Sequence, residues 1–279
     1  MFLDTSVFDR GNTNANWPSP STELRLSVSR YVYAVTEMPS PAPVERTGLT
    51  NPNQDHPGQN HPGQDRPPGS ELTPPSRIEV AVAGYRNDPE TARLGLSSTD
   101  ARVRSGALTA LARASALETA MLLNGLTDPT PSVVRRAVEL SSTESRGATA
   151  VDDSLLTHLR SDSQMLVEVA AFALGERHQE ASASTLVDAV VAALSRVAVE
   201  HADPLAREAA VAALGSVGLP SGLAAVLSAT TDKATVRRRA VLALAAFEGE
   251  EVNEALHRAR TDRDWQVRQA AEDLTNPRI

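Results

Sequence analysis

Apolar residues recur through the second half of the chain at a spacing that predicts a series of similar helices. The pattern Val-Arg-x-x-Ala-x-x-x-Leu occurs in full at residues 103–111 and 236–244, and variants of it begin at Ala206 and Val267. The aligned copies share an alanine at the fifth position: Ala107, Ala137, Ala170, Ala210, Ala240 and Ala271. Neighbouring alanines are 30, 33, 40, 30 and 31 residues apart. This period is typical of stacked repeats, each of which buries its apolar face against its neighbours.

Each copy of the register predicts an inner helix, which is followed by a less regular outer helix. The expected outer helices are residues 117–126, 153–159, 219–227 and 251–259, and the 40-residue interval leaves room for a longer one at 184–200. A capping helix is expected at 77–86. A short helix follows it, with Asp88 at the N-cap and Pro89 at the first helical position.

Arginine recurs at the second position of the register, in Arg104, Arg207, Arg237 and Arg268. An aspartate precedes five of the six copies by three or four residues. We expect these arginines to form a ladder, each bridging to the capping aspartate of an adjacent repeat with bidentate geometry. The alternative is a track of arginines that contacts phosphates. Val134 and Val167 replace arginine in the second and third copies, so either arrangement is interrupted there.

Composition excludes several classes of site. The chain has no cysteine, which rules out disulfides, thiolate metal sites and thiol nucleophiles. Its net charge of −8 argues against a dedicated nucleic-acid-binding domain, because such domains carry a basic face. No stretch approaches the ~20 apolar residues of a membrane span, and the first 20 residues lack the apolar core of a secretory signal. We therefore expect a cytoplasmic protein.

Residues 1–76 differ from the rest of the chain. They are rich in Pro, Gly, Asn and Gln and contain a short tandem, His56-Pro57-Gly58-Gln59 and His61-Pro62-Gly63-Gln64. Proline disfavours helix in the preceding residue, so a disordered, low-complexity tail is expected here. An apolar patch from Leu24 to Tyr33 is compatible with one short strand or helix, but a single element cannot bury itself.

The combination of Asp, Val-Arg, Ala and Ala-Leu, closing once as Ala173-Leu174-Gly175-Glu176, resembles HEAT repeats of the short bacterial type named after phycobilin lyases. The resemblance covers residues 77–279. It implies an all-α fold, a right-handed solenoid of about six antiparallel helix pairs in which the inner helices line a concave binding face.

Some families with this fold are enzymes, but their functional residues are missing here. The chain resembles deoxyhypusine hydroxylase in its repeats, yet it contains none of the His-Glu pairs that hold iron in that family. The HEAT-like DNA glycosylases match only weakly, at residues 263–268. Trp265 in that stretch is expected to pack on the preceding helix, and His158, His178, His201 and His257 are expected to be surface residues. We therefore predict no catalytic, cofactor-binding or metal-binding residue.

The function expected from these features is that of a non-catalytic scaffold or adaptor that binds a protein partner through the concave face. Arg136, Arg238 and Arg239 are predicted to contact an acidic partner, and Phe172 is predicted to anchor it, since interface anchors are often aromatic. Two alternatives remain. One is a lyase-like or other accessory enzyme component acting on a modified protein or a tetrapyrrole, and the other is a HEAT protein that binds nucleic acid.

Overall fold

A computed structural model describes residues 74–275, and the expectations for residues 1–73 lie outside this range. The described residues form thirteen α-helices and two 3-10 helices. Their bounds are α2 (Arg77–Arg86), α3 (Pro89–Gly95), α4 (Ala101–Arg113), α5 (Thr119–Leu126), α6 (Pro131–Ser141), α7 (Thr149–His158), α8 (Gln164–Arg177), α9 (Thr185–Glu200), α10 (Pro204–Val217), η1 (Pro220–Gly222), α11 (Leu223–Ala229), α12 (Ala234–Ala243), η2 (Leu244–Ala246), α13 (Glu250–Ala259) and α14 (Trp265–Thr275).

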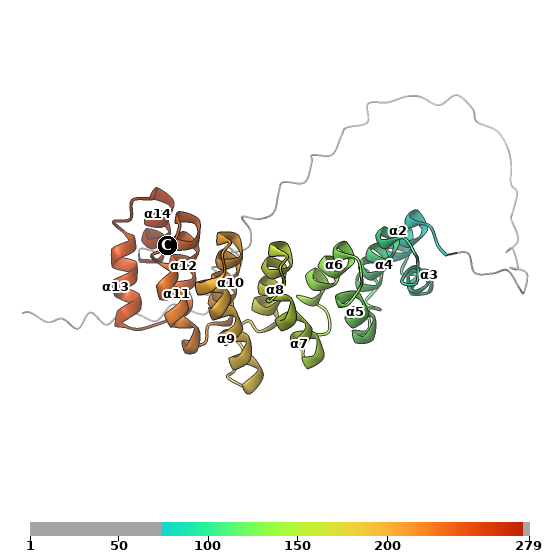
Figure 1. The fold of residues 1–279 in the computed structure, drawn as a ribbon, viewed down its shortest axis with the longest axis horizontal. Helices are drawn as coiled ribbons and strands as arrows, with labels where there is room; N and C mark the ends of the chain where they lie inside the picture. Colours follow the sequence, from blue (N-terminus) through green and yellow to red (C-terminus); the bar gives the residue numbers. More distant parts are fainter. Residues whose placement is uncertain (1–73, 276–279) are drawn as a thin grey trace, which may run out of the picture.

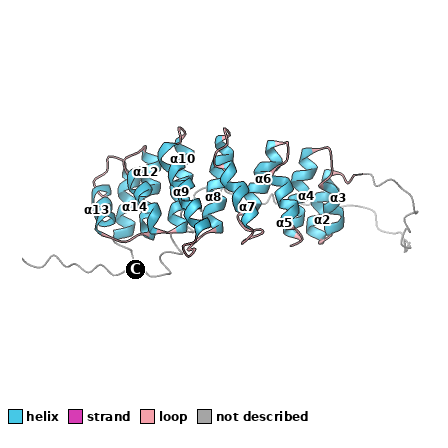
Figure 2. Ribbon diagram, turned by 60° about the horizontal axis from the view of Figure 1, so that its bottom comes forward, coloured by secondary structure: helices cyan, strands magenta, loops and turns pink. Residues whose placement is uncertain are grey.

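The helices follow one another along a solenoid in the order of the sequence (Figure 1). Helices α2, α4, α6, α8, α10, α12 and α14 pack against one another in succession and form an inner layer. Helices α3, α5, α7, α9, α11 and α13 form an outer layer, and Figure 2 shows the same succession of helices from a second direction. The described part of the chain is therefore the α-solenoid of helix pairs that the sequence predicts.

Side-chain caps begin several of the helices. Ser76 and Glu79 form a reciprocal capping box at the start of α2. Asp88 caps α3, which has a proline in its first turn, and Asp100 and Asp203 accept backbone hydrogen bonds at the starts of α4 and α10. These carboxylates satisfy amide groups that a helix leaves without partners at its N-terminus.

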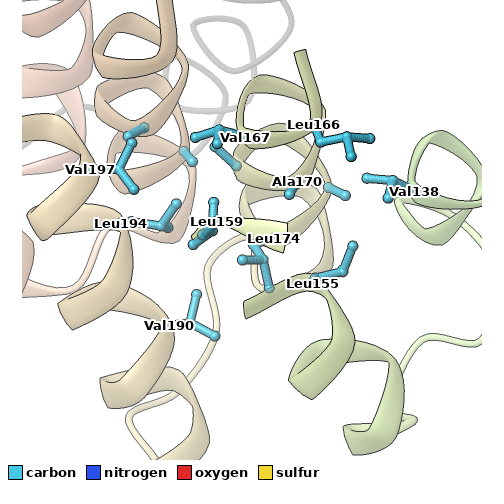
Figure 3. Packing of buried hydrophobic residues seen from close by; sticks show 14 of the residues in the cluster. Val138, Leu155, Leu159, Leu166, Val167, Ala170, Leu174, Val190, Leu194 and Val197 are labelled. Atoms are coloured by element: carbon cyan, nitrogen blue, oxygen red, sulfur yellow. The ribbon is translucent and has the colours of Figure 1, made fainter. Parts of the chain in front are cut away.

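The register positions form one continuous core. All six shared alanines are buried, and the apolar residue that begins each copy of the register is buried as well. Figure 3 shows Ala170 and Leu174 of α8 between Leu194 of α9 and Val138 of α6. Small residues let adjacent inner helices approach closely, because a Cβ added to Gly215 of α10 would lie 2.8 Å from the Cβ of Ala243 in α12.

The lengthened outer helix is present. Helix α9 runs from Thr185 to Glu200, and the apolar residues that predict it from Val187 to Val197 are buried. The expected outer helix at 219–227 is instead divided into η1 and α11, because Pro220 begins a 3-10 turn before the helix. None of the helices in residues 74–275 is both long and apolar enough to cross a membrane.

Candidate partner-binding surface

Three of the four register arginines form a ladder between repeats. Two of their partners, Asp128 and Asp262, lie five residues before the register and not at the expected cap, and Arg268 donates only to carbonyl oxygens of its own turn within the described residues. We number each repeat from the first apolar residue of its register, so that Val103 is position 1, Arg104 is position 2 and Ala107 is position 5. The position-2 arginine donates from Nε and Nη2 to both carboxylate oxygens of an aspartate in the turn before the next inner helix. The three pairs are Arg104–Asp128 (2.8 and 2.8 Å), Arg207–Asp232 (2.6 and 2.8 Å) and Arg237–Asp262 (2.9 and 2.7 Å).

Each arginine also joins its own turn to the next repeat. Arg207 Nη1 donates to the carbonyl oxygens of His201 and Ala202, at 2.8 and 3.0 Å. The hydrogen bond from Arg207 lowers the pKa of Asp232, and the Asp128 and Asp262 carboxyls have lowered pKa values for the same reason. Charge-assisted bidentate pairing therefore occupies these guanidinium groups. The three arginines are not available to contact phosphates.

The ladder is interrupted at two repeats. Val134 of α6 and Val167 of α8 stand where other repeats have arginine, and Ser161 and His201 stand five residues before the next register, where Asp128 and Asp262 stand in two of the paired repeats. Both residues keep the local turn, because Ser161 Oγ accepts from the amide of Ser163 and His201 Nδ1 accepts from the amide of Asp203. Asp162 in the turn before α8 is exposed to solvent, so it does not need a counter-ion where Val134 replaces arginine.

The side of the inner layer that carries positions 3, 4 and 7 of each repeat is called the inner face; most of these residues are partly exposed, but Ala212, Leu242 and Ala270 are buried. Positions 5 and 9 lie on the opposite side of each helix, since a helix turns by about 100° per residue. At α6 this face is occupied by an ionic cluster. Glu139 accepts from Arg135 at 2.6 Å and from Arg136 at 2.8 Å, and all three side chains are partly exposed.

Arg238 and Arg239 of α12 lie in different environments. Arg239 Nη2 lies 3.1 Å from Glu208 Oε1 on α10, and its side chain is only 12% exposed. Arg238 is half-buried and has no ion pair within the described residues. Arg238 thus lies half-buried on the inner face, whereas Arg239 joins two inner helices.

Phe172 lies at position 7 of α8, between acidic residues on the same side of the helix. Glu168 precedes it by four residues and accepts from Gln164 at 2.9 Å, and Glu176 follows it by four residues. Burial raises the pKa of Glu176, an effect that Arg146 partly opposes. The inner face therefore changes sign along the solenoid, with arginines on α6 and α12 and glutamates on α8.

A buried ionic cluster beneath α8 was not predicted. Arg177 Nε lies 2.6 Å from Asp152 Oδ1, and both side chains are 1% exposed. Arg177 also donates to the carbonyl oxygens of Ser141, Glu144, Ser145 and Ala148, which ties the loop between α6 and α7 to α8. The register could not reveal the cluster, because Arg177 lies beyond position 9 and Asp152 belongs to an irregular outer helix.

Two expectations for individual side chains are wrong. His178 is not a surface residue, because it contacts Asp152 at 3.0 Å and joins the buried cluster. Trp265 does not pack on the preceding helix and is 65% exposed at the start of α14. The described residues contain no group of three or more His, Cys, Asp or Glu side chains arranged to hold a metal ion.

Comparison with known proteins identifies the repeats. Residues 152–245 and 191–274 match the family model of HEAT repeats. No curated protein matches the sequence. A designed armadillo repeat protein in complex with the peptide (KR)4 is similar in structure, with 18% identity over 67% of this chain and 97% of that chain and a TM-score of 0.51. An engineered protein matches with 19% identity over 72% of this chain and 60% of its own, with a TM-score of 0.50.

The complex of CpcE and CpcF of phycocyanin lyase from Nostoc sp. PCC7120 matches with 20% identity over 77% of this chain and 80% of that chain, at a TM-score of 0.47. Likeness at these identities concerns the fold alone. Residues 152–274 are thus similar to HEAT repeats, and the described residues form an α-solenoid similar in fold to the designed armadillo repeat protein.

Proposed function

We propose that this HEAT-repeat solenoid is a non-catalytic scaffold or adaptor that binds a protein partner through its inner face. The observation that carries the proposal is a contrast between positions of the repeat. Position 5 is a buried alanine in all six copies of the register. Position 3, on the inner face, is Ser105, Arg135, Glu168, Glu208, Arg238 or Gln269. Folding requires the same buried alanine in every repeat, whereas the variety of the partly exposed position-3 residues suits recognition of a partner along an extended surface.

The partner that fits this surface is a protein segment of mixed charge. Arg136 and Arg238 suit acidic side chains near α6 and α12, and Phe172 between Glu168 and Glu176 suits an apolar or basic side chain near α8. Arg239 contributes by holding Glu208 in place, at 3.1 Å. Electrostatic complementarity of this kind sets register and specificity more than affinity. The absence of cysteine is in keeping with a cytoplasmic setting, which we also propose.

A charge-reversal experiment tests the proposal. Arg238→Glu, alone and together with Phe172→Ala, should abolish partner capture while far-UV circular dichroism remains unchanged. The matched control is Arg258→Glu on the outer helix α13, where the arginine side chain is 64% exposed and lies 3.5 Å from Glu254. Retained capture by the Arg238 variants, or an equal loss of capture in the control, would contradict binding of the partner through the inner face.

The material that co-purifies with the protein in the capture experiment also tests the alternative functions. A bound tetrapyrrole would absorb visible light, which would favour an accessory component of a lyase-like enzyme. Bound nucleic acid would be released steeply as salt rises. Either result without a protein partner would contradict the scaffold proposal.

A further inference from the structure

The turns that lead from each outer helix to the next inner helix form one edge of the solenoid, which we call the turn edge. The arginine ladder links its last turns in order. Arg207 bonds to two carbonyl oxygens in the turn before α10 and pairs with Asp232 in the turn before α12. Arg237 bonds to the carbonyl oxygen of Asp232 at 2.8 Å and pairs with Asp262 in the turn before α14. The last two turns, residues 230–233 and 260–264, therefore lie side by side at the C-terminal end of the solenoid (Figure 1).

The charge of the turn edge changes sign toward α14. Outside the ladder pairs, the turns before α4, α6, α8 and α10 contain three carboxylates and one cation: Asp100, Asp162, Asp203 and Arg160. The turns before α12 and α14 contain one carboxylate outside the ladder pairs and three exposed cations: Asp264, Lys233, Arg260 and Arg263. The last two turns are thus a basic patch in a chain whose net charge is −8.

The three cations of this patch form no ion pair within residues 74–275. Lys233 and Arg263 each follow a ladder aspartate in the sequence, but the register arginines already occupy both oxygens of those two carboxylates. Asp264 accepts from two amides at the start of α14. Arg268 adds a further positive charge next to the second turn, where it donates to the carbonyl oxygens of residues 262 and 263. The patch therefore has cations in excess of the carboxylates that could neutralise them.

An exposed aromatic ring lies at the border of the patch. Trp265 is the first residue of α14, directly follows the basic turn and is 65% exposed. Tryptophan and arginine are the residue types most enriched among those that dominate the binding energy of protein interfaces. The ring offers an apolar contact beside charges that attract carboxylates, so the two features together specify a ligand that is both acidic and apolar.

A short acidic protein segment fits the patch better than a long polyanion such as nucleic acid. Guanidinium groups bind carboxylates with bidentate geometry. The patch extends over two adjacent inner helices, whose axes typically lie about 8 to 10 Å apart, and an extended peptide covers that distance with a few residues at about 3.4 Å each. A longer polyanion that followed the turn edge would next meet the carboxylates of Asp203 and Asp162, which would repel it.

We propose that Lys233, Arg260, Arg263 and Trp265 form a second binding surface, separate from the inner face, for a short acidic protein segment that carries an apolar side chain. Carboxylates of the segment pair with the three cations, and its apolar side chain packs on the ring of Trp265. Binding at this surface does not require the inner face, because none of its four residues belongs to positions 3, 4 or 7 of a repeat.

Fluorescence titration of the full chain tests the proposal. The probe is a synthetic peptide of Glu and Asp residues around one central Leu. Trp17→Phe leaves Trp265 as the one tryptophan of the chain, so that emission reports on this ring. In that background, Arg260→Gln with Arg263→Gln removes two cations from the patch. The matched control removes two exposed arginines at the acidic part of the turn edge, by Arg102→Gln with Arg160→Gln. Far-UV circular dichroism checks that all variants keep their helices.

The expected result is a shift of the Trp265 emission to shorter wavelength and a loss of about tenfold in affinity for the peptide in the patch variant. The control pair should bind as the unaltered chain does, and so should the inner-face variant Arg238→Glu with Phe172→Ala, which separates this test from that of the proposed function. No saturable shift, or an equal loss of affinity in the control pair or the inner-face variant, would overturn the proposal. Tighter binding of a short oligothymidylate through the same two arginines would assign the patch to nucleic acid and also overturn it.

Discussion

The Arg207–Asp232 pair allows a quantitative test of the ladder. Arg207 makes four hydrogen bonds, two to the Asp232 carboxylate and two to carbonyl oxygens of its own turn. The side chains are 13% and 20% exposed, so solvent screens the pair only in part. Arg207→Ala leaves Asp232 largely buried without its counter-ion, and we expect a loss of about 3 kcal/mol in the free energy of unfolding.

A double-mutant cycle with Arg207→Ala and Asp232→Ala isolates the interaction between the two side chains. We expect a coupling energy of about 2 kcal/mol, typical of a close charged pair that shares hydrogen bonds. The control cycle uses Glu254 and Arg258 on α13, whose side chains are 62% and 64% exposed, and should give no more than about 0.5 kcal/mol. Urea unfolding followed by circular dichroism measures both cycles. Equal coupling energies would refute the ladder as a stabilising element.

The pH dependence of the ladder follows from the lowered pKa of Asp232. A carboxyl whose pKa is lower in the folded than in the unfolded state adds stability above its unfolded pKa of about 3.9. That stability is lost as the pH falls through the folded pKa. The coupling energy should therefore be complete at pH 7 and vanish in strong acid, and a coupling that persists there would contradict ionic pairing.

Three further substitutions have expected outcomes that urea unfolding can measure. Gly215→Ala should destabilise the protein by about 1 to 3 kcal/mol because its Cβ would collide with α12. Gly106→Ala, whose Cβ would make an ordinary contact at 3.6 Å, should stabilise the protein by about 0.5 to 1 kcal/mol. A change of the same sign in both variants would refute the close approach of the helices. Arg177→Met should cost about 3 to 5 kcal/mol, since it leaves buried Asp152 without its arginine, and a loss below about 1 kcal/mol would contradict this. Glu176→Gln should stabilise the protein at pH 7, where burial disfavours the charged form, and the gain should disappear below about pH 4 as the carboxyl becomes protonated in both states; a gain independent of pH would argue against that cause.

The sequence predicts the repeats well because each one obeys the same local rules. Alanine at position 5, arginine at position 2 and a cap before the helix are local features, and they place the inner helices and the ladder. The aspartates of the ladder show the limit of this reasoning. Asp128 and Asp262 lie two residues before the N-cap residues Thr130 and Asp264. Which residue reaches the arginine depends on how one repeat is rotated against the next.

The inner face was harder to predict because pairing across helices decides which charges are available. Arg238 and Arg239 are adjacent in sequence, yet only Arg239 reaches Glu208 on the preceding helix. The exposure of Trp265 likewise depends on the geometry of the last repeat. No period in the sequence specifies contacts between side chains at variable positions, which is why the buried Asp152–Arg177 cluster also went unforeseen.

Partner capture by the full chain and its inner-face variants is the most direct test of binding through the inner face. The protein captured by the unaltered chain would be purified, and its affinity would be measured for that chain, for Arg238→Glu with Phe172→Ala, and for the outer-layer control Arg258→Glu. We expect the inner-face variant to lose at least tenfold in affinity, equal to about 1.4 kcal/mol, while the control binds as the unaltered chain does. Unchanged binding by the inner-face variant, or loss of binding in the control alone, would contradict a scaffold that recognises its partner through the inner face.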